Sequence, residues 1–313
     1  MGGGGGGGTF YSRSPSELSN QVRREEQRTA GVAFEAELAG LLGTLLGAYN
    51  SRDAVVANQR LDELKELLEE QIDGSFDQLF GGSVAKRTYV EGLSDVDSLI
   101  VIDDCDLADA PPRKVLATID RILSRRLGSA AEVSHGRMAV TVDYGDGVVI
   151  QLLPALKASG EKLKVPSSRT NGWSRIDPVA FQEALTRRNQ ECAGKLVPTI
   201  KLAKAINGQL PEKQRLSGYH IESLGIAAFR GYEGPKTTAA MLPTFFEKAR
   251  DLVLTPIRDR TGQSVHVDDY LGPANSAARL NASHIIGRLA RRMRNATAAQ
   301  SQEQWLSMFG IEE

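Results

Sequence analysis

Apolar residues recur at helical spacing through the first part of the chain. The clearest examples are Leu61, Leu64, Leu67 and Leu68. Residues that are three or four positions apart lie on one face of a helix. The whole segment Ser16–Glu70 is also rich in Leu, Ala, Glu, Gln and Arg, which favour helices. We predict two long helices here, interrupted near Asn50–Asp53.

Strand patterns begin after a sharp turn at Phe80–Ser83. The segment Thr88–Ile102 ends in VDSLIVI, which alternates between apolar and polar residues and then becomes continuously apolar. That pattern is typical of a strand entering a buried sheet. We predict a helix over Ala110–Leu127, because Pro111 and Pro112 suit a helix start.

Two further strands, Ala139–Tyr144 and Val148–Leu153, are joined by Gly145–Gly147, which is a strong hairpin signal. With a three-residue loop, residues 141 and 143 pair with residues 151 and 149. One face of the hairpin then holds Thr141, Asp143, Val149 and Gln151. The opposite face is apolar and holds Val140, Val142, Tyr144, Val148, Ile150 and Leu152.

After Pro166 the pattern changes to helices separated by Gly and Pro. The predicted helices are Pro178–Arg188, Val197–Asn207, Tyr219–Phe229, Thr237–Leu254 and Asn275–Thr297. We therefore predict an α+β fold with a flexible Gly-rich tail over 1–15, an α/β lobe over 16–165 and a helical lobe over 166–313. The active site is expected in the cleft between the lobes.

Composition narrows the class of protein. With 38 basic and 39 acidic residues, the net charge is −1, unlike the basic surface of a protein that coats duplex nucleic acid. Cys105 and Cys192 are too far apart for a Cys-rich zinc site. The most apolar stretches are shorter than the ~20 residues that cross a bilayer. We expect a cytoplasmic protein with no transmembrane helix.

Asp95 and Asp97 are the candidate catalytic residues. Residues two apart on a strand point to the same face, so both carboxylates can reach one metal site. Two Mg²⁺ or Mn²⁺ ions held there would neutralise charge on a phosphate during nucleotidyl transfer. Gly82 and Ser83, twelve residues earlier, offer backbone amides and a hydroxyl to a phosphate.

The ordered run GGSVAKRTYVEGLSDVDSLIVI resembles the signature of polymerase-β-like nucleotidyltransferases. More narrowly, the segment from about Phe80 to Met293 resembles the cGAS/DncV-like nucleotidyltransferases of bacteria. Three later segments carry that narrower resemblance: VVIQLLPA, KLVPTIKLAKA and LSGYHIESL. The resemblance implies a polymerase-β-like lobe followed by a helical lobe. It also implies an enzyme that joins NTPs or dNTPs into a cyclic or linear oligonucleotide, with Hailong-type oligodeoxynucleotide synthesis as one alternative.

The same resemblance assigns nucleotide-binding roles in the helical lobe. Lys201 and Lys204 share a helix face and would bind the donor triphosphate, with Lys204 the better match. Ser217 would contact phosphate, and Tyr219 would stack on a base.

Gln151 departs from the family pattern, which has a third metal-binding acid at this position. An amide oxygen is a neutral ligand and cannot accept the proton of an attacking hydroxyl. Three explanations stay open: a natural variation, an inactivating substitution or a pseudoenzyme. Asp143 lies on the same hairpin face and could supply the missing carboxylate.

The resemblance further implies a role in antiphage defence beside an effector protein, with no membrane and no long duplex DNA as activator. Two other functions stay open from the sequence. One is a catalytically silent nucleotide-binding sensor, and the other is nucleotidyl transfer to RNA ends or to a small acceptor.

Overall fold

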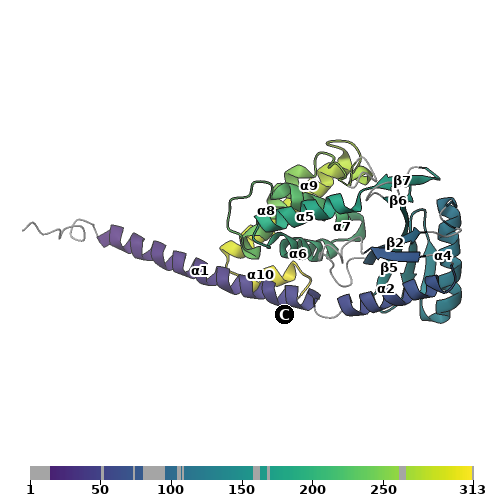
Figure 1. Ribbon diagram of the computed structural model, residues 1–313. Coiled ribbons are helices and arrows are strands. Elements are labelled where there is room, and N and C mark those ends of the chain that lie inside the picture. The colour runs from purple at the N-terminus through teal and green to yellow at the C-terminus, as the bar shows by residue number, and fades with distance from the viewer. Residues whose placement is uncertain are drawn as a thin grey trace, which may run out of the picture.

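The computed structural model describes residues 15–50, 53–72, 75–79, 96–103, 107, 109–157, 163–167, 170–260 and 266–311. Within these ranges a mixed sheet and a group of α-helices lie side by side, and the first half of the first helix projects away from both (Figure 1).

The two predicted N-terminal helices are confirmed as α1 (Pro15–Asn50) and α2 (Asp53–Glu69). They serve different parts of the fold. Apolar residues in the second half of α1 pack into the core of the C-terminal helices, whereas those of α2 pack against the sheet.

The sheet has seven strands in the order β1-β2-β5-β4-β3, with β6 paired to both β5 and β7. Their bounds are β1 Ser75–Leu79, β2 Val96–Asp103, β3 Glu132–His135, β4 Val140–Asp143, β5 Val149–Lys157, β6 Leu163–Pro166 and β7 Trp173–Ile176. Strands β2 and β5 are parallel, and the other pairs are antiparallel. A parallel pair at the centre needs a crossover connection, which the chain between β2 and β5 provides.

One face of the sheet is covered by α2 and by α4 (Pro112–Leu127), which begins two residues after the predicted start at Ala110. The buried strand residues on this face are Ile100, Ile102, Val140, Val142, Val148, Ile150 and Leu152. The alternate residues Leu99, Val101 and Ala155 belong to a smaller core on the other face. The predicted apolar face of the hairpin is thus confirmed.

Helix α2 also fixes the hairpin loop. The guanidinium of Arg60 donates hydrogen bonds to both carboxylate oxygens of Asp146, at 3.0 and 2.6 Å. The same guanidinium lies 4.0 Å from the ring centroid of Tyr144. The N–H of Tyr144 donates to the carbonyl of Val148, as the predicted three-residue loop requires.

The C-terminal part of the chain is helical. Its α-helices are α5 Pro178–Glu191, α6 Leu196–Gly208, α7 Gly218–Ala228, α8 Thr238–Leu252, α9 Ala277–Ala298 and α10 Gln302–Ser307. Short 3-10 helices lie at η1 Gly128–Ala130, η2 Glu212–Gln214 and η3 Asp269–Leu271. Helices α6 and α7 pack closely at Gly225, where an added Cβ would lie 2.8 Å from the side chain of Ile200. The five predicted C-terminal helices are confirmed, and α10 was missed.

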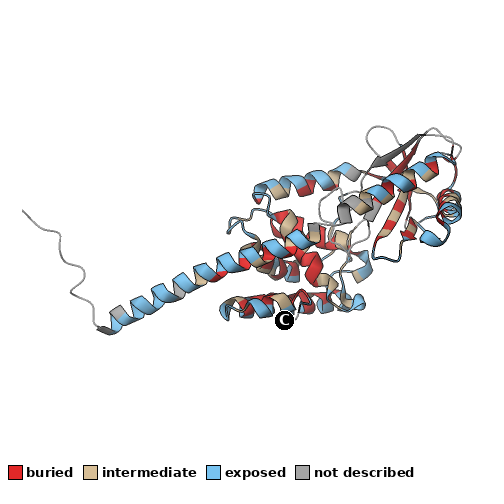
Figure 2. Cartoon of the chain, turned by 90° about the horizontal axis from the view of Figure 1, so that it is seen from below, coloured by how far each residue is buried: buried red, intermediate tan, exposed pale blue. Residues whose placement is uncertain are grey.

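Helix α1 changes character along its length (Figure 2). Its second half buries Phe34, Leu38, Leu42 and Leu45, while its first half is largely exposed. Contrary to the sequence expectation, its segment Ser19–Tyr49 is long and apolar enough to cross a membrane, by length and composition alone.

Candidate active site

Part of the predicted phosphate and metal site lies outside the described residues. This applies to Gly82, Ser83 and Asp95. The backbone of Asp97 is described as part of β2, but its side chain is not. Their roles stay predictions.

The strand register brings three of the sequence-derived positions into one row. Asp97 of β2 pairs with Gln151 of β5, and Gln151 pairs with Thr141 of β4. Paired residues on neighbouring strands, about 4.8 Å apart, direct their side chains to the same face. Asp97 therefore shares a face with Leu99 and lies opposite the side covered by α2 and α4. The predicted pairing of Thr141 with Gln151 is confirmed.

Asp143 lies at the other end of the hairpin. It pairs with Val149, as predicted, so it is a diagonal neighbour of Gln151 at a distance of about 7–8 Å. Strand β5 separates it from Asp97, and its carboxylate accepts the N–H of Gly145 at 2.8 Å. Position 151 is therefore closer to Asp97 than position 143 is.

Lys204 lies inside the helical lobe. Its ammonium donates to the carboxylate of Glu222 on α7 at 2.8 Å, and only 4% and 2% of the two side chains are exposed. The ammonium also lies beside the α7 N-terminus, 3.4 Å from where a Cβ on Gly218 would be. An alanine at 218 would therefore make only an ordinary van der Waals contact with the lysine.

Lys201 lies one turn earlier on α6 and is half-buried. Burial lowers the pKa of its ammonium, and the like charge of Lys204 lowers it further. A second positive charge so close to Lys204 is unfavourable in the free protein. An anion bound at this end of α7 would relieve it.

Ser217 is the N-cap of α7. Its hydroxyl oxygen accepts the N–H of His220 at 3.2 Å, and its own N–H donates to the hydroxyl of Tyr270 at 3.2 Å. The predicted phosphate-binding serine therefore has a structural role at a helix N-terminus, where the helix dipole also favours a phosphate.

Tyr219 is half-buried beside this cap. Its hydroxyl donates to the buried carboxylate of Asp259 at 2.7 Å, and its ring lies 4.7 Å from that of Phe181, centroid to centroid. Its predicted role in base stacking is not tested by these contacts, which hold the ring in one place.

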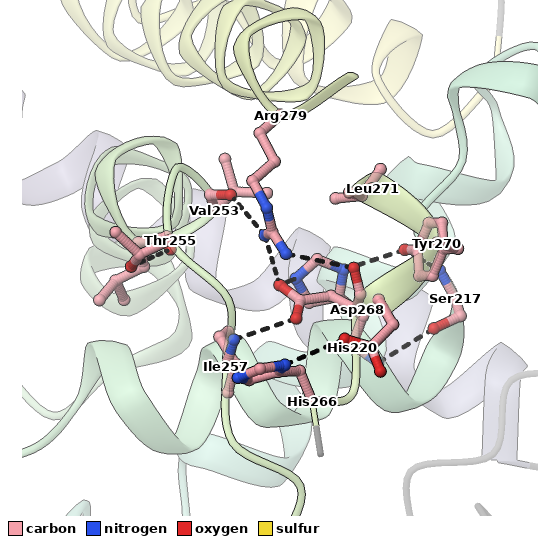
Figure 3. A network of polar contacts seen from close by, with 12 residues as sticks. Ser217, His220, Val253, Thr255, Ile257, His266, Asp268, Tyr270, Leu271 and Arg279 are labelled. Atoms are coloured by element: carbon pink, nitrogen blue, oxygen red, sulfur yellow. Dashed lines mark hydrogen bonds and ion pairs between the residues drawn. The ribbon is translucent and has the colours of Figure 1, made fainter. Parts of the chain in front are cut away.

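A buried polar network supports the same helix end (Figure 3). The guanidinium of Arg279 on α9 donates to the carboxylate of Asp268 at 2.6 Å, and both side chains are fully buried. His220 lies next in the network, with Nε2 at 3.4 Å from Asp268 and Nδ1 at 2.9 Å from the Tyr270 hydroxyl. The first turn of α7 is thus attached to η3 and α9.

Other charged side chains of the helical lobe have ordinary partners. His266 bonds to Asp269 at 3.0 Å. Where side chains are described, no group of three or more His, Cys, Asp or Glu residues is placed to hold a metal ion. On α9, Arg292 bonds to Ser307, and Arg294 bonds to Glu247.

Four residues that make the hydrogen bonds of this region were not identified from the sequence: Glu222, Asp259, Tyr270 and Arg279. Two carried a detectable signal. Glu222 is a lone acid in the apolar run IESLGIAA, and Arg279 is a cation in the first turn of a helix, where the dipole disfavours it. Each pattern indicates a buried partner of opposite charge.

Residues 48–189 match a family model described as Second Messenger Oligonucleotide or Dinucleotide Synthetase domain. The matched region contains β2, the β4–β5 hairpin and the row through Gln151, and it ends before α6. None of the curated proteins matches the chain.

Solved structures share the fold over most of the chain. The complex of CdnC with HORMA-deltaN from E. coli MS115-1 has 17% identity and a TM-score of 0.62, covering 84% of this chain and 92% of that one. CdnG from Bradyrhizobium diazoefficiens with GTP has 17% identity and a TM-score of 0.62, covering 82% and 90%. Vibrio cholerae DncV, a cyclic AMP-GMP synthase, has 10% identity and a TM-score of 0.61, covering 95% and 90%.

The Lys204–Glu222 pair gives a test of stability. Removing one partner of a buried ion pair leaves an unpaired charge and costs about 3–5 kcal/mol, whereas replacing both with apolar residues is often neutral. We expect Lys204→Met and Glu222→Leu each to lower the free energy of unfolding by about that amount, and the double variant to recover most of it. Lys201→Met is the control and should cost far less. Equal losses in the single and double variants, in urea titrations, would contradict the pairing.

His220 gives a test of pH dependence. Burial lowers the pKa of its imidazole to about 4, partly offset by Asp268 and reinforced by Arg279. Between about pH 6.5 and 4 the unfolded chain takes up a proton that the folded chain does not, so stability falls as the pH falls. We expect the Tm to drop through this window and His220→Asn to flatten the slope. His284→Asn, an exposed histidine of α9, should keep it.

Proposed function

We propose that the chain is a cGAS/DncV-like nucleotidyltransferase that joins nucleoside triphosphates into an oligonucleotide signal, because residues 48–189 match the Second Messenger Oligonucleotide or Dinucleotide Synthetase model. In this reaction a sugar hydroxyl oxygen bonds to the α-phosphorus of a triphosphate, and the bond from that phosphorus to pyrophosphate breaks. The hydroxyl proton passes to a carboxylate of the Asp95 and Asp97 pair.

The match of residues 48–189 to the family model supports this proposal most directly. Within the matched region, the strand register pairs Asp97 of the acidic motif with Gln151 of the central strand β5. The charged groups of the helical lobe add to it. We assign the triphosphate of the donor nucleotide to Lys201 and the capped N-terminus of α7, beside which lies Lys204, whose own charge is paired with Glu222.

Metal dependence is part of the proposal. Asp95, Asp97 and the amide oxygen of Gln151 are hard oxygen donors, which fit Mg²⁺ or Mn²⁺. A bound metal ion would neutralise the charge that develops on phosphate oxygens. The residues of this chain would orient the acceptor hydroxyl, bind the triphosphate and receive the proton.

A second function has its own support. Gln151 stands in the row beside Asp97, where an amide contributes no charge to a metal and cannot act as a base. A chain with this row and an intact triphosphate region would bind nucleotides without joining them. The alternative is therefore a nucleotide-binding sensor.

One experiment separates these functions. The purified chain is incubated with labelled NTPs and dNTPs, with Mg²⁺ or Mn²⁺, and assayed for oligomers, pyrophosphate and bound nucleotide. The proposed enzyme gives oligomers and pyrophosphate, whereas a sensor binds nucleotide and releases none. Label transferred to added RNA or to a small acceptor would instead indicate a tailing enzyme. The products also show whether the chain prefers ribose or deoxyribose and whether it closes a ring.

A cytoplasmic role in antiphage defence, with an effector protein that detects the oligonucleotide, extends the same proposal. The complex of E. coli CdnC with HORMA-deltaN shows that one protein of similar fold has a protein partner. Co-expression of this chain with proteins encoded beside it, followed by pull-down, tests that extension.

The acidic motif gives the central prediction. Asp95→Asn together with Asp97→Asn should abolish oligomer formation, because the substitutions remove two metal-binding charges. Folding should be unaffected, since the changes relieve charge repulsion and remove no core side chain. Turnover and Tm are measured together, with Asp62→Asn, at an exposed position of α2, as the control. Unchanged turnover in the double variant would refute the proposed site.

Position 151 gives the sharpest comparison. Gln151→Asp places a carboxylate in the row beside Asp97, so we expect it to raise turnover by about tenfold or more. Asp143→Asn removes a more distant carboxylate that is engaged by Gly145, so it should have the smaller effect. The opposite result, a large loss in Asp143→Asn with a silent Gln151→Asp, would mean that Asp143 supplies the third acid. If both variants are silent, the site works with two carboxylates or only binds.

A further inference from the structure

Tyr270 is unusual in its exposure. Among the large hydrophobic residues that the structure describes as exposed, it is the one aromatic residue, with 54% of its surface accessible. It belongs to η3, and its hydroxyl reaches the first turn of α7 (Figure 3). An exposed ring with an anchored hydroxyl presents a flat apolar surface at a fixed position.

Two hydrogen bonds hold its hydroxyl in place. The N–H of Ser217 donates to the Tyr270 oxygen at 3.2 Å, and Nδ1 of His220 lies 2.9 Å from the same oxygen, with the donor set by the imidazole tautomer. Nε2 of His220 faces the carboxylate of Asp268 at 3.4 Å. A neutral imidazole is what burial favours at this position.

The buried charged residues next to Tyr270 hold its hydrogen-bonded hydroxyl in a fixed position. Asp268 accepts from Arg279 at 2.6 Å and from the N–H of Ile257 at 3.0 Å. Arg279 also donates to the carbonyls of Gly272 and Val253, at 2.9 and 3.0 Å. Fully buried groups with this many partners have little freedom to move. Little conformational entropy is therefore lost when a ligand binds to the ring.

We propose that the exposed ring of Tyr270 is a stacking surface for the base of a nucleotide whose phosphates bind at the first turn of α7. The inference rests on the proposed function, because it assumes a nucleoside triphosphate near Lys204 and Ser217. Every nucleobase has a π face, so stacking would bind nucleotides without selecting one base.

The contacts of Tyr219 distinguish the two tyrosines. Phe181 lies against its ring, and the ring as a whole is half-buried. Tyr270 contacts His220 edge to face, with ring centroids 5.9 Å apart, which leaves more of its ring accessible. A base approaching the α7 N-terminus therefore meets a larger free aromatic surface on Tyr270 than on Tyr219.

Two ligands separate stacking from a purely structural role. Isothermal titration compares α,β-methylene ATP and GTP, which carry bases, with inorganic tripolyphosphate, which does not, using the full chain and its Tyr270→Phe and Tyr270→Leu variants. We expect Tyr270→Leu to weaken binding of the nucleotide analogues by roughly 10- to 100-fold, the range for base stacking on an aromatic ring. Tripolyphosphate binding should not change. Tyr270→Phe, which keeps the ring, should retain most of the nucleotide affinity.

Tyr232→Leu is the matched control, since its hydroxyl bonds to the carbonyl of Pro235 and its ring packs on Phe229, away from α7's first turn. If both Tyr270 variants weaken tripolyphosphate and nucleotide alike, the residue only supports Ser217 and the stacking proposal is wrong. Full nucleotide affinity in Tyr270→Leu also overturns it. If the unsubstituted chain does not bind nucleotides, the proposed function is refuted as well.

Discussion

The hydrogen bonds between the parallel strands β2 and β5 fix the position of every sheet residue considered for the site. They pair Asp97 with Gln151, while the β4–β5 hairpin pairs Gln151 with Thr141. If β5 slipped by one residue, Ile150 would leave the core under α2 and α4, and Gln151 would turn toward that core. The apolar side chains on the other face prevent this slip. Hydrophobic burial on one side of the sheet therefore holds the polar row in place on the other.

In the helical lobe the main constraint is the burial of charged side chains. It removes Lys204, Glu222, Asp268 and Arg279 from water, which is unfavourable unless each charge has a partner. The two ion pairs converge on α7, one at Glu222 and the other through His220. Both pairs are sensitive to the placement of this helix, because a small displacement would separate buried charges. The N-terminus of α7, where we propose that phosphate binds, is accordingly one of the most constrained parts of the lobe.

The sequence predicted those features that depend on local patterns. Apolar spacing located α1, α2 and the five helices from α5 to α9, and the Gly145–Gly147 loop gave the register of the hairpin. Strands β1, β3, β6 and β7 were missed because they are four or five residues long, too short to show a clear period. The buried pairs were missed for another reason. Lys204 and Glu222 are 18 residues apart, and nothing in either local pattern shows that their helices pack together.

The candidate site, too, was predictable from the sequence only where it depends on a local pattern. Adjacency of Gln151 to Thr141 followed from the loop length, whereas adjacency to Asp97 depends on a crossover connection that the sequence does not specify. Position 151 lies beside Asp97 whether it holds an amide or a carboxylate, because backbone pairing and the core on the other face set its place. The backbone register is therefore the same for either residue at this position, whereas metal binding distinguishes them. Selection for stability alone would preserve the row without its third acid, and only selection for metal binding would keep a carboxylate there.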